Sequence, residues 1–139
     1  MVFVSSQLSV VDCLGALDGT HIAIKVPKAL SARYRNRKGF ISMNVLAVCN
    51  FDFEFLFVLP GWEGSAHDGR VLADNMSKGF EIPPNHFYLA DAGYGLCSQL
   101  LTPYRGTRYH LREQYLAQMK PRTKEELFNL RHAQYRYIL

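Results

Sequence analysis

The chain has 139 residues, of which 48% are hydrophobic and 13% aromatic, and its formal net charge is +4. This length suits a single domain, and the chain is too apolar to remain disordered in water. No apolar run approaches the ~20 residues of a membrane-spanning helix, and the N-terminal segment lacks the basic start and long apolar stretch of a secretory signal.

Three β-rich segments occupy the first half of the chain. Residues 14–26 alternate loosely between apolar and polar side chains before a proline, which predicts a strand. Residues 43–51 and 53–61 are two further β-rich runs, and the polar "NFDFE" at 50–54 favours a hairpin turn between them. We expect the Pro-Gly pair at 60–61 to end the second run.

In the next segment the apolar residues are spaced as in a helix rather than a strand. Residues 65–80 predict a helix with Ser65 or Asp68 as its N-cap and Gly79 at its C-terminal stop. After a proline-containing turn, residues 87–94 ("FYLADAGY") predict a short strand that breaks at its aspartate.

The C-terminal part of the chain is predicted to be largely helical. Residues 98–106 are expected to be irregular and residues 107–119 helical, followed by a helix over 123–139 that begins with the capping-box pair Thr123 and Glu126. Leu127, Leu130, Gln134 and Ile138 recur with a helical period in this last segment. The order of elements indicates an α/β fold, with a mixed sheet that begins with antiparallel strands and is covered by helices.

Two aspartates stand where strands are predicted to end. Asp18 in "LDGT" and Asp91 in "ADAGY" each follow apolar residues and precede a glycine-containing turn. Functional side chains gather at strand ends in open α/β sheets. Two carboxylates brought together there would repel unless a cation neutralised them, and magnesium prefers carboxylate oxygens. The pair therefore points to a divalent-metal site suited to phosphodiester chemistry, and the alternative is two aspartates that cap turns.

Several phrases of the sequence share a family pattern. "GALDGTHI", "RYRNRKGFISMNVLAVCNFDFEFLFVLPGWEGSAHDGRVL", "FYLADAGY", "LLTPYRG" and "KEELFNLRHAQYR" occur in this order. Together they resemble the DDE nuclease domain of PIF/Harbinger-type transposases and their domesticated relatives. The resemblance runs from about residue 11 to the last residue.

This resemblance implies an RNase H-like fold in which three acidic residues hold two divalent cations, Mg²⁺ or Mn²⁺. In that family, water attacks a DNA phosphodiester at the transposon end, and the freed 3′-hydroxyl then attacks target DNA. Carried over by motif, Asp18 is the first catalytic, metal-binding acid and Asp91 is the second. The third acid, a glutamate four residues after the match to Arg136, is expected at position 140, one residue beyond Leu139.

The resemblance therefore implies one nuclease domain over residues 1–139, without the upstream helix-turn-helix segment and without the third acid. We expect such a chain to have impaired activity. The alternative is a catalytically inactive remnant or domesticated module that binds DNA or protein. DNA at transposon ends and at the target, a separate Myb-like DNA-binding partner, self-association and a nuclear location are the further expectations that the resemblance brings.

Three other polar residues are candidates for supporting roles near the metal. Asp68 either faces the metals or caps the helix that begins in "SAHDGR", and the cap is the favoured interpretation. In the functional interpretation, Asp68 either faces the metals or orients His67. His21 either contacts phosphate or metal-bound water, or is a hydrogen-bonded histidine of the scaffold.

Cations flank an acidic centre. Residues 39–104 carry two cations against seven anions, whereas residues 105–139 carry eight cations against three anions. Such a distribution suits a polyanion held around a cation site, or else solvated surfaces. The predicted DNA-binding residues are the four cations of "RYRNRK": Arg33, Arg35, Arg37 and Lys38. Arg131 and Arg136 of the last helix either approach DNA or pair with the nearby glutamates.

Overall fold

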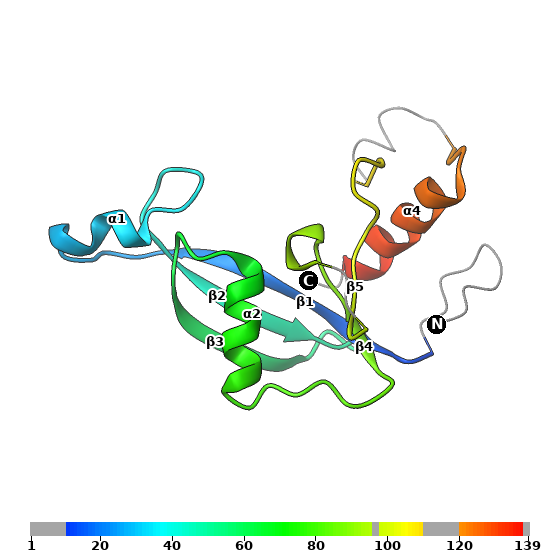
Figure 1. Cartoon of the computed structure of the whole chain (residues 1–139), viewed down its shortest axis with the longest axis horizontal. Helices are drawn as coiled ribbons and strands as arrows, with labels where there is room; N and C mark the ends of the chain where they lie inside the picture. The colour runs from blue at the N-terminus through cyan, green and yellow to red at the C-terminus, as the bar shows by residue number, and fades with distance from the viewer. Residues whose placement is uncertain (1–10, 96–97, 110–119, 138–139) are drawn as a thin grey trace.

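A five-stranded mixed sheet forms the body of the protein (Figure 1). The structure, a computed structural model, describes residues 11–95, 98–109 and 120–137. The strands are β1 (Cys13–Ala23), β2 (Ser42–Cys49), β3 (Phe55–Glu63), β4 (Phe87–Leu89) and β5 (Leu100–Leu101). The helices are η1 (Lys28–Leu30), α1 (Ser31–Tyr34), α2 (Asp68–Ser77), η2 (Ala92–Tyr94) and α4 (Lys124–Arg136). No helix within these described ranges has the length and apolarity needed to cross a membrane.

The strand β1 is the centre of the sheet, whose order is β3-β2-β1-β4-β5. It pairs antiparallel with β2, with Asp18 opposite Ala47, and parallel with β4, with Ala16 opposite Leu89. The remaining pairs are antiparallel for β2 with β3 and parallel for β4 with β5. The predicted α/β class is confirmed, and the arrangement is consistent with an RNase H-like fold.

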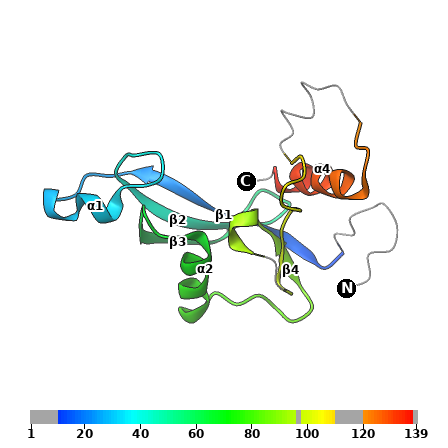
Figure 2. The same cartoon turned by 45° about the horizontal axis from the view of Figure 1, so that its top comes forward.

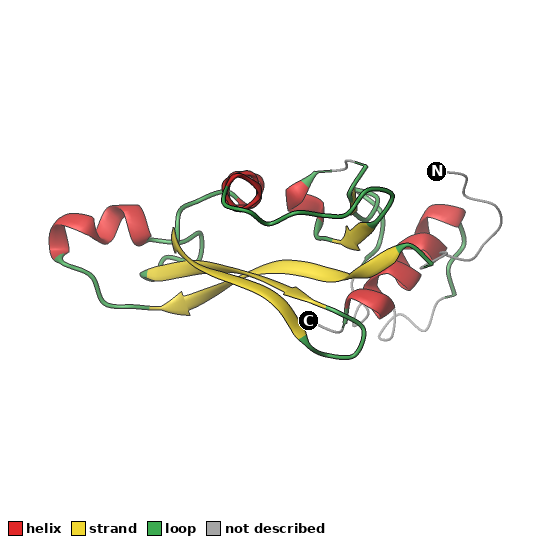
Figure 3. Ribbon diagram, turned by 90° about the horizontal axis from the view of Figure 1, so that it is seen from below, coloured by secondary structure: helices red, strands yellow, loops and turns green. Residues whose placement is uncertain are grey.

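Helices α2 and α4 lie on opposite faces of this sheet (Figures 2 and 3). Successive side chains of a strand point to opposite faces, so neighbours in β1 serve different cores. Leu17 of β1 joins the larger core with Val71 of α2, whereas Ala16 joins a smaller core against which Phe128 of α4 packs. Asp18 has the same parity as Ala16, and its side chain therefore belongs to the α4 face.

The ends of α2 are set by its neighbours in sequence. His67 is the N-cap, since its ring Nδ1 accepts a hydrogen bond from the backbone N–H of Gly69 at 3.2 Å. The predicted caps, Ser65 and Asp68, were wrong, because Asp68 is already the first helical residue. The predicted stop at Gly79 is confirmed. Its φ is +99°, and the N–H of Phe80 returns to the carbonyl of Asn75 at 3.0 Å, as in a Schellman motif.

Strand β3 continues through Pro60 and Gly61 to Glu63, where the sequence predicted its end. Proline cannot donate a ladder hydrogen bond, but β3 is an edge strand and the β2–β3 register shifts between the pairs Asn44–Trp62 and Leu46–Leu59. Pro60 and Gly61 therefore fall in an irregularity at the edge of the sheet, where both residue types are tolerated.

Two predictions for the segment after β4 were wrong. Residues 98–106, expected to be irregular, contain β5, a two-residue strand with no periodicity to detect. Residues 107–109, the described part of the helix expected over 107–119, are not helical. The rest of that expected helix lies outside the described residues.

Helix α4 begins as predicted and packs differently from the prediction. The Thr123 hydroxyl accepts a hydrogen bond from the N–H of Glu126 at 3.1 Å, which confirms the N-cap. The buried residues of α4 are Asn129, His132 and Ala133. Leu127 and Leu130 are only half-buried, Gln134 is exposed, and Ile138 lies outside the described residues. Hydrogen bonding, described below, explains this polar inward face.

Candidate metal centre

Asp18 lies inside β1, which continues to Ala23, so the prediction that a strand ends at this aspartate was wrong. Its side chain faces α4. One of its carboxylate oxygens, Oδ1, accepts the backbone N–H of Gly19 at 2.8 Å, and the other, Oδ2, accepts Nη2 of Arg136 at 2.5 Å. Its side chain is 42% exposed, so solvent reaches the carboxylate. A β-strand thus presents a charged group at the boundary between the sheet and α4.

Asp91 follows β4 and begins η2, as the predicted break in the strand requires. The parallel register of β1 and β4 pairs Ala16 with Leu89. Asp18 and Asp91 each come two residues after these partners in the chain. Residues two apart share a face, so the register carries Asp18 and Asp91 to the same side. The Asp91 Oδ1 lies 3.9 Å from Nη1 of Arg136.

The Arg136 guanidinium lies between the two carboxylates. Its side chain is 16% exposed, and it donates to Asp18 and, at 3.3 Å, to the hydroxyl of Tyr109. Its Nε is buried and has no hydrogen-bond partner among the described residues. From the sequence, Arg136 was predicted either to approach DNA or to pair with the glutamates at the start of its own helix. The structure places it on Asp18, 118 residues away in the chain.

A chain of hydrogen bonds fixes α4, and with it Arg136, against the sheet. His132 Nε2 donates to the carbonyl of Leu101 at 2.8 Å, and its Nδ1 lies 3.1 Å from the Tyr109 hydroxyl. One turn earlier, the Asn129 amide bonds both the N–H and the carbonyl of Tyr104, at 2.8 and 3.0 Å. The partners of these polar side chains are backbone groups of β5 and of the segment after it, together with the Tyr109 hydroxyl, which explains why α4 buries polar residues.

The local charges perturb the titration of the site. Burial raises the pKa of Asp18, the Arg136 guanidinium and the Gly19 N–H oppose this rise, and the negative charges of Asp91 and Asp68 add to it. The Tyr94 hydroxyl is buried and has no hydrogen-bond partner among the described residues. Its pKa is raised far above its ordinary value. Burial is the main cause, and Asp68 contributes next. Three carboxylates therefore act on one small volume.

Asp68 comes to this volume from the N-terminus of α2. A Cβ on Gly93 would lie 2.9 Å from Oδ2 of Asp68 and 3.7 Å from Oδ2 of Asp91. Both carboxylates thus approach the same glycine of η2. Since Asp68 is not the cap of its helix, its carboxylate is available to face the acid pair, which was the less favoured interpretation of the sequence.

The donor chemistry of the acid pair fits a hard divalent cation. Carboxylate oxygens suit Mg²⁺ and Mn²⁺, and Mg²⁺ is commonly held by one or two carboxylates while it keeps several waters. Asp18 and Asp91 meet that requirement, because both reach one guanidinium. Within the described ranges, no group of three or more His, Cys, Asp or Glu side chains is arranged to hold an ion. The structure thus offers a two-carboxylate site with a third acid nearby.

Of the two predicted histidines, His21 stands apart from the acid pair, whereas His67 lines a cavity together with Asp91. His21 is three residues beyond Asp18 in β1, so its side chain points to the opposite face, and its Nδ1 lies 3.0 Å from the Ser42 hydroxyl. This agrees with the hydrogen-bonded scaffold interpretation. His67 caps α2 and is exposed.

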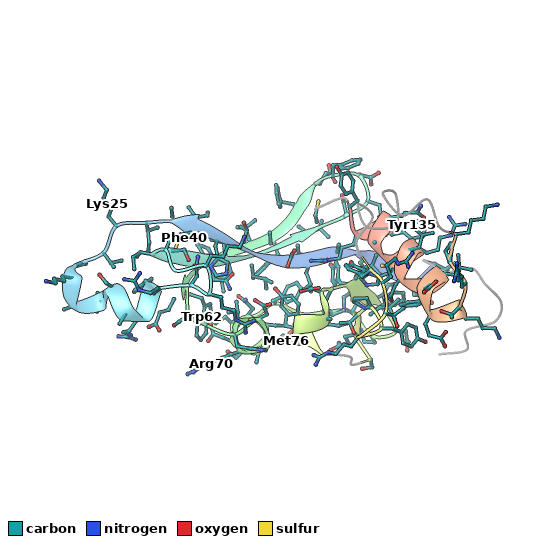
Figure 4. All side chains as sticks on the ribbon, turned by 90° about the horizontal axis from the view of Figure 1, so that it is seen from above. Lys25, Phe40, Trp62, Arg70, Met76 and Tyr135 are labelled. Carbon is teal, nitrogen blue, oxygen red and sulfur yellow. The ribbon has the colours of Figure 1, made fainter. Side chains whose placement is uncertain are left out.

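The predicted DNA-binding cations are all exposed, and they lie in one segment formed by α1 and the loop that follows it. Arg33 lies in α1, where a loop was expected, and pairs with Glu63. Arg35 donates to the carbonyl of Gly39 at 2.7 Å. The segment around α1, marked by Lys25, lies at the opposite end of the molecule from Tyr135 of α4 (Figure 4).

Arg37 is the predicted cation that the structure brings to the acid pair. It lines a cavity of about 600 Å³ together with Asp91 and His67. Arg105, which the sequence did not single out, lines the same cavity and donates to the carbonyl of Ala92 at 2.8 Å. An acidic residue and two cations therefore border one opening.

Comparison with known proteins adds to this geometry. The family model of the DDE superfamily endonucleases matches residues 17–139, which include both aspartates and the whole sheet beyond the start of β1. The chain belongs to the DDE superfamily endonuclease family. The predicted family is thereby confirmed.

The relatives of this DDE endonuclease chain include animal and plant proteins. The chain is 40% identical over 93 residues to "Putative nuclease HARBI1" of Rattus norvegicus and 37% identical to the Homo sapiens protein of that name. Each of these alignments covers 65% of this chain and 27% of the relative. "Protein ALP1-like" of Arabidopsis thaliana is 30% identical over 142 residues, which cover 88% of this chain and 32% of the relative. The chain thus spans about a third or less of these relatives, and no solved structure matches it.

Proposed function

We propose that this chain is the catalytic core of a divalent-metal-dependent DNA endonuclease and strand transferase of the Harbinger type, with Asp18 and Asp91 as ligands of the cation. One observation carries the proposal. Two carboxylates, one from within β1 and one just after β4, separated by the 72 residues 19–90, converge on a single guanidinium. A purely structural ion pair needs one carboxylate, and like charges gather chiefly where a cation is to be bound.

The residues of the site would divide the work as follows. Asp18 and Asp91 would each give a carboxylate oxygen to Mg²⁺ or Mn²⁺, and Asp68 would add negative charge beside Asp91. Such ions, when bound, polarise a phosphodiester and lower the pKa of a bound water. Tyr109 and His132 hold α4 in place through the hydrogen bonds already described.

DNA would approach along the cavity beside Asp91. Arg37 and Arg105 border this cavity, and their guanidinium groups suit phosphate oxygens. The cations of "RYRNRK" that lie further from the acid pair, Arg33, Arg35 and Lys38, would contact the duplex outside the cleavage site. Removal of a phosphate contact weakens binding uniformly across sequences and lowers its salt dependence.

The activity proposed for residues 1–139 is weak. The described residues supply two close carboxylates rather than the three expected of the family, and a guanidinium already occupies the space between them. A two-metal site that lacks a ligand holds its second ion poorly. The same observation favours the second candidate function, a module that binds DNA or protein without cutting. Transposon ends and target DNA as substrates, a Myb-like partner, self-association and a nuclear location belong to the proposal.

Nicking of supercoiled plasmid tests the proposal. With Mn²⁺ the chain should nick slowly, and Asp91→Asn should abolish the reaction. The matched control is Asp52→Asn, which removes the same charge from an exposed turn. Fast nicking would contradict the proposed impairment. Nicking that survives Asp91→Asn would refute the assigned site. Mn²⁺-dependent DNA binding without nicking, lost in Asp91→Asn, would identify the binding module.

A further inference from the structure

We propose that Arg136 is an internal counter-cation of the acid pair, which a divalent ion must displace in order to bind Asp18 and Asp91. The inference rests on the proposed function, because it takes these two aspartates as the ligands of the ion. It assigns to Arg136 a positioning role that opposes the metal. Arg136 would thereby set how much free metal the protein needs.

The positions of the three side chains support this role. The Arg136 side chain is 16% exposed, whereas the side chains of Asp18 and Asp91 are 42% and 46% exposed. The cation thus lies on the inner side of the pair, against α4, and the anions face solvent. An ion that arrives from solvent meets the carboxylates first, with Arg136 behind them.

The contacts of Arg136 are incomplete, so a competitor can replace them. A guanidinium that recognises carboxylates well makes two parallel hydrogen bonds. Here only Nη2 donates to a carboxylate, at 2.5 Å. The Nη1 to Asp91 distance of 3.9 Å exceeds a hydrogen bond, and Nε is buried without a partner among the described residues. The hydroxyl of Tyr109, at 3.3 Å from Nη1, gives the guanidinium a partner that is not a carboxylate and that a metal would not remove.

Charge makes the competition strong. Arginine stays protonated under all ordinary conditions, so Arg136 does not release the ionised aspartates by losing its own proton. A divalent ion carries twice the charge and binds carboxylate oxygens directly. The ion and the guanidinium would both require Asp18 Oδ2, so each weakens the other. A charge at this distance shifts a carboxylate equilibrium by one to three log units, which predicts that Arg136 weakens metal binding about tenfold or more.

The test compares Arg136→Gln with Arg131→Gln by Mn²⁺ calorimetry and by thermal unfolding in EDTA and in Mn²⁺. Arg131 is on the same helix, is exposed and donates to the side-chain oxygen of Gln134 at 3.3 Å, so it controls for helix charge. Arg136→Gln should bind Mn²⁺ about tenfold more tightly and melt lower in EDTA. Its gain in melting temperature with Mn²⁺ should exceed that of the unsubstituted chain. Arg136→Lys, which keeps the charge, should bind Mn²⁺ more weakly than Arg136→Gln.

The outcomes separate this inference from the proposed function. Equal Mn²⁺ affinity in Arg136→Gln and the unsubstituted chain, with affinity still lost in Asp91→Asn, would overturn the counter-cation and leave the metal site standing. An equal gain in Arg131→Gln would also overturn it, because the effect would then be one of net charge. Absence of Mn²⁺ binding from both the unsubstituted chain and Arg136→Gln would refute both proposals.

Discussion

Mild acid should destabilise this protein through His132. The Nε2 of this histidine donates to the Leu101 carbonyl, which can only accept, so Nε2 carries the proton. In the neutral ring Nδ1 therefore accepts from the Tyr109 hydroxyl, whose oxygen accepts from Arg136. Protonation would turn Nδ1 into a donor and place a second cation close to Arg136.

The size of the effect follows from proton linkage. Burial lowers the pKa of His132, the Arg136 charge adds to this, and the Leu101 carbonyl and the Asp91 charge oppose it. A lowered pKa in the folded state means that the unfolded chain binds the proton first. Stability is thus intact above pH about 6.5 and is lost as the pH falls towards the folded-state pKa. At about pH 5.5 the loss reaches up to about 1.4 kcal/mol.

Urea unfolding at about pH 7.5 and about pH 5.5 measures this loss as a difference in unfolding free energy. The drop should shrink by about 1 kcal/mol in His132→Gln. It should persist in His86→Gln, which removes a half-buried histidine bonded to the carbonyl of Pro84. An unchanged drop in His132→Gln would refute the assigned tautomer and the neutral state of the ring.

Three further substitutions test the packing around the site. Gly93→Ala should weaken Mn²⁺ affinity several-fold in calorimetry with little loss of stability, because its Cβ would lie 2.9 Å from the Asp68 carboxylate oxygen Oδ2. The control is Gly69→Ala, whose Cβ would meet only ordinary contacts from 3.6 Å, and it should change neither the affinity nor the stability. Gly15→Ala should lower the free energy of unfolding by more than about 3 kcal/mol in chemical denaturation, because its Cβ would overlap the Cys49 carbonyl of β2 at 1.9 Å. Gly39→Ala, at a positive φ in open space, should lower it by about 1 kcal/mol. Asn129→Ala should cost about 3 kcal/mol in the same assay, because the buried Asn129 amide makes three hydrogen bonds to the backbone of Tyr104 and Thr107. A cost under about 1 kcal/mol would contradict the role given to that amide.

Local signals predicted much of the fold. The hairpin of β2 and β3, the stop of α2 at Gly79 and the Thr123 cap depend on side chains within a few residues of each other. The expectation that Asp18 and Asp91 meet rested on placing both at strand ends, which holds for Asp91 but not for Asp18, because β1 continues to Ala23. The parallel register that carries them to one face is a pairing between distant segments, which no local pattern states.

The rest depended on tertiary contacts. β5 has two residues and exists because β4 offers it an edge. The face of α4 was assigned wrongly because the rule that apolar residues point inward fails when backbone groups need partners, as they do at Asn129 and His132. Arg136 follows His132 by four residues and so lies on that same buried face. That spacing is the signal that could have placed it.

The central claim is that Asp18 and Asp91 together hold one divalent ion. Calorimetry with Mn²⁺ on the unsubstituted chain, Asp18→Asn and Asp91→Asn tests it most directly, with Asp52→Asn as the matched control. The claim predicts one binding event that either site substitution weakens about tenfold or more and that the control leaves unchanged. Identical isotherms for all four proteins would contradict it.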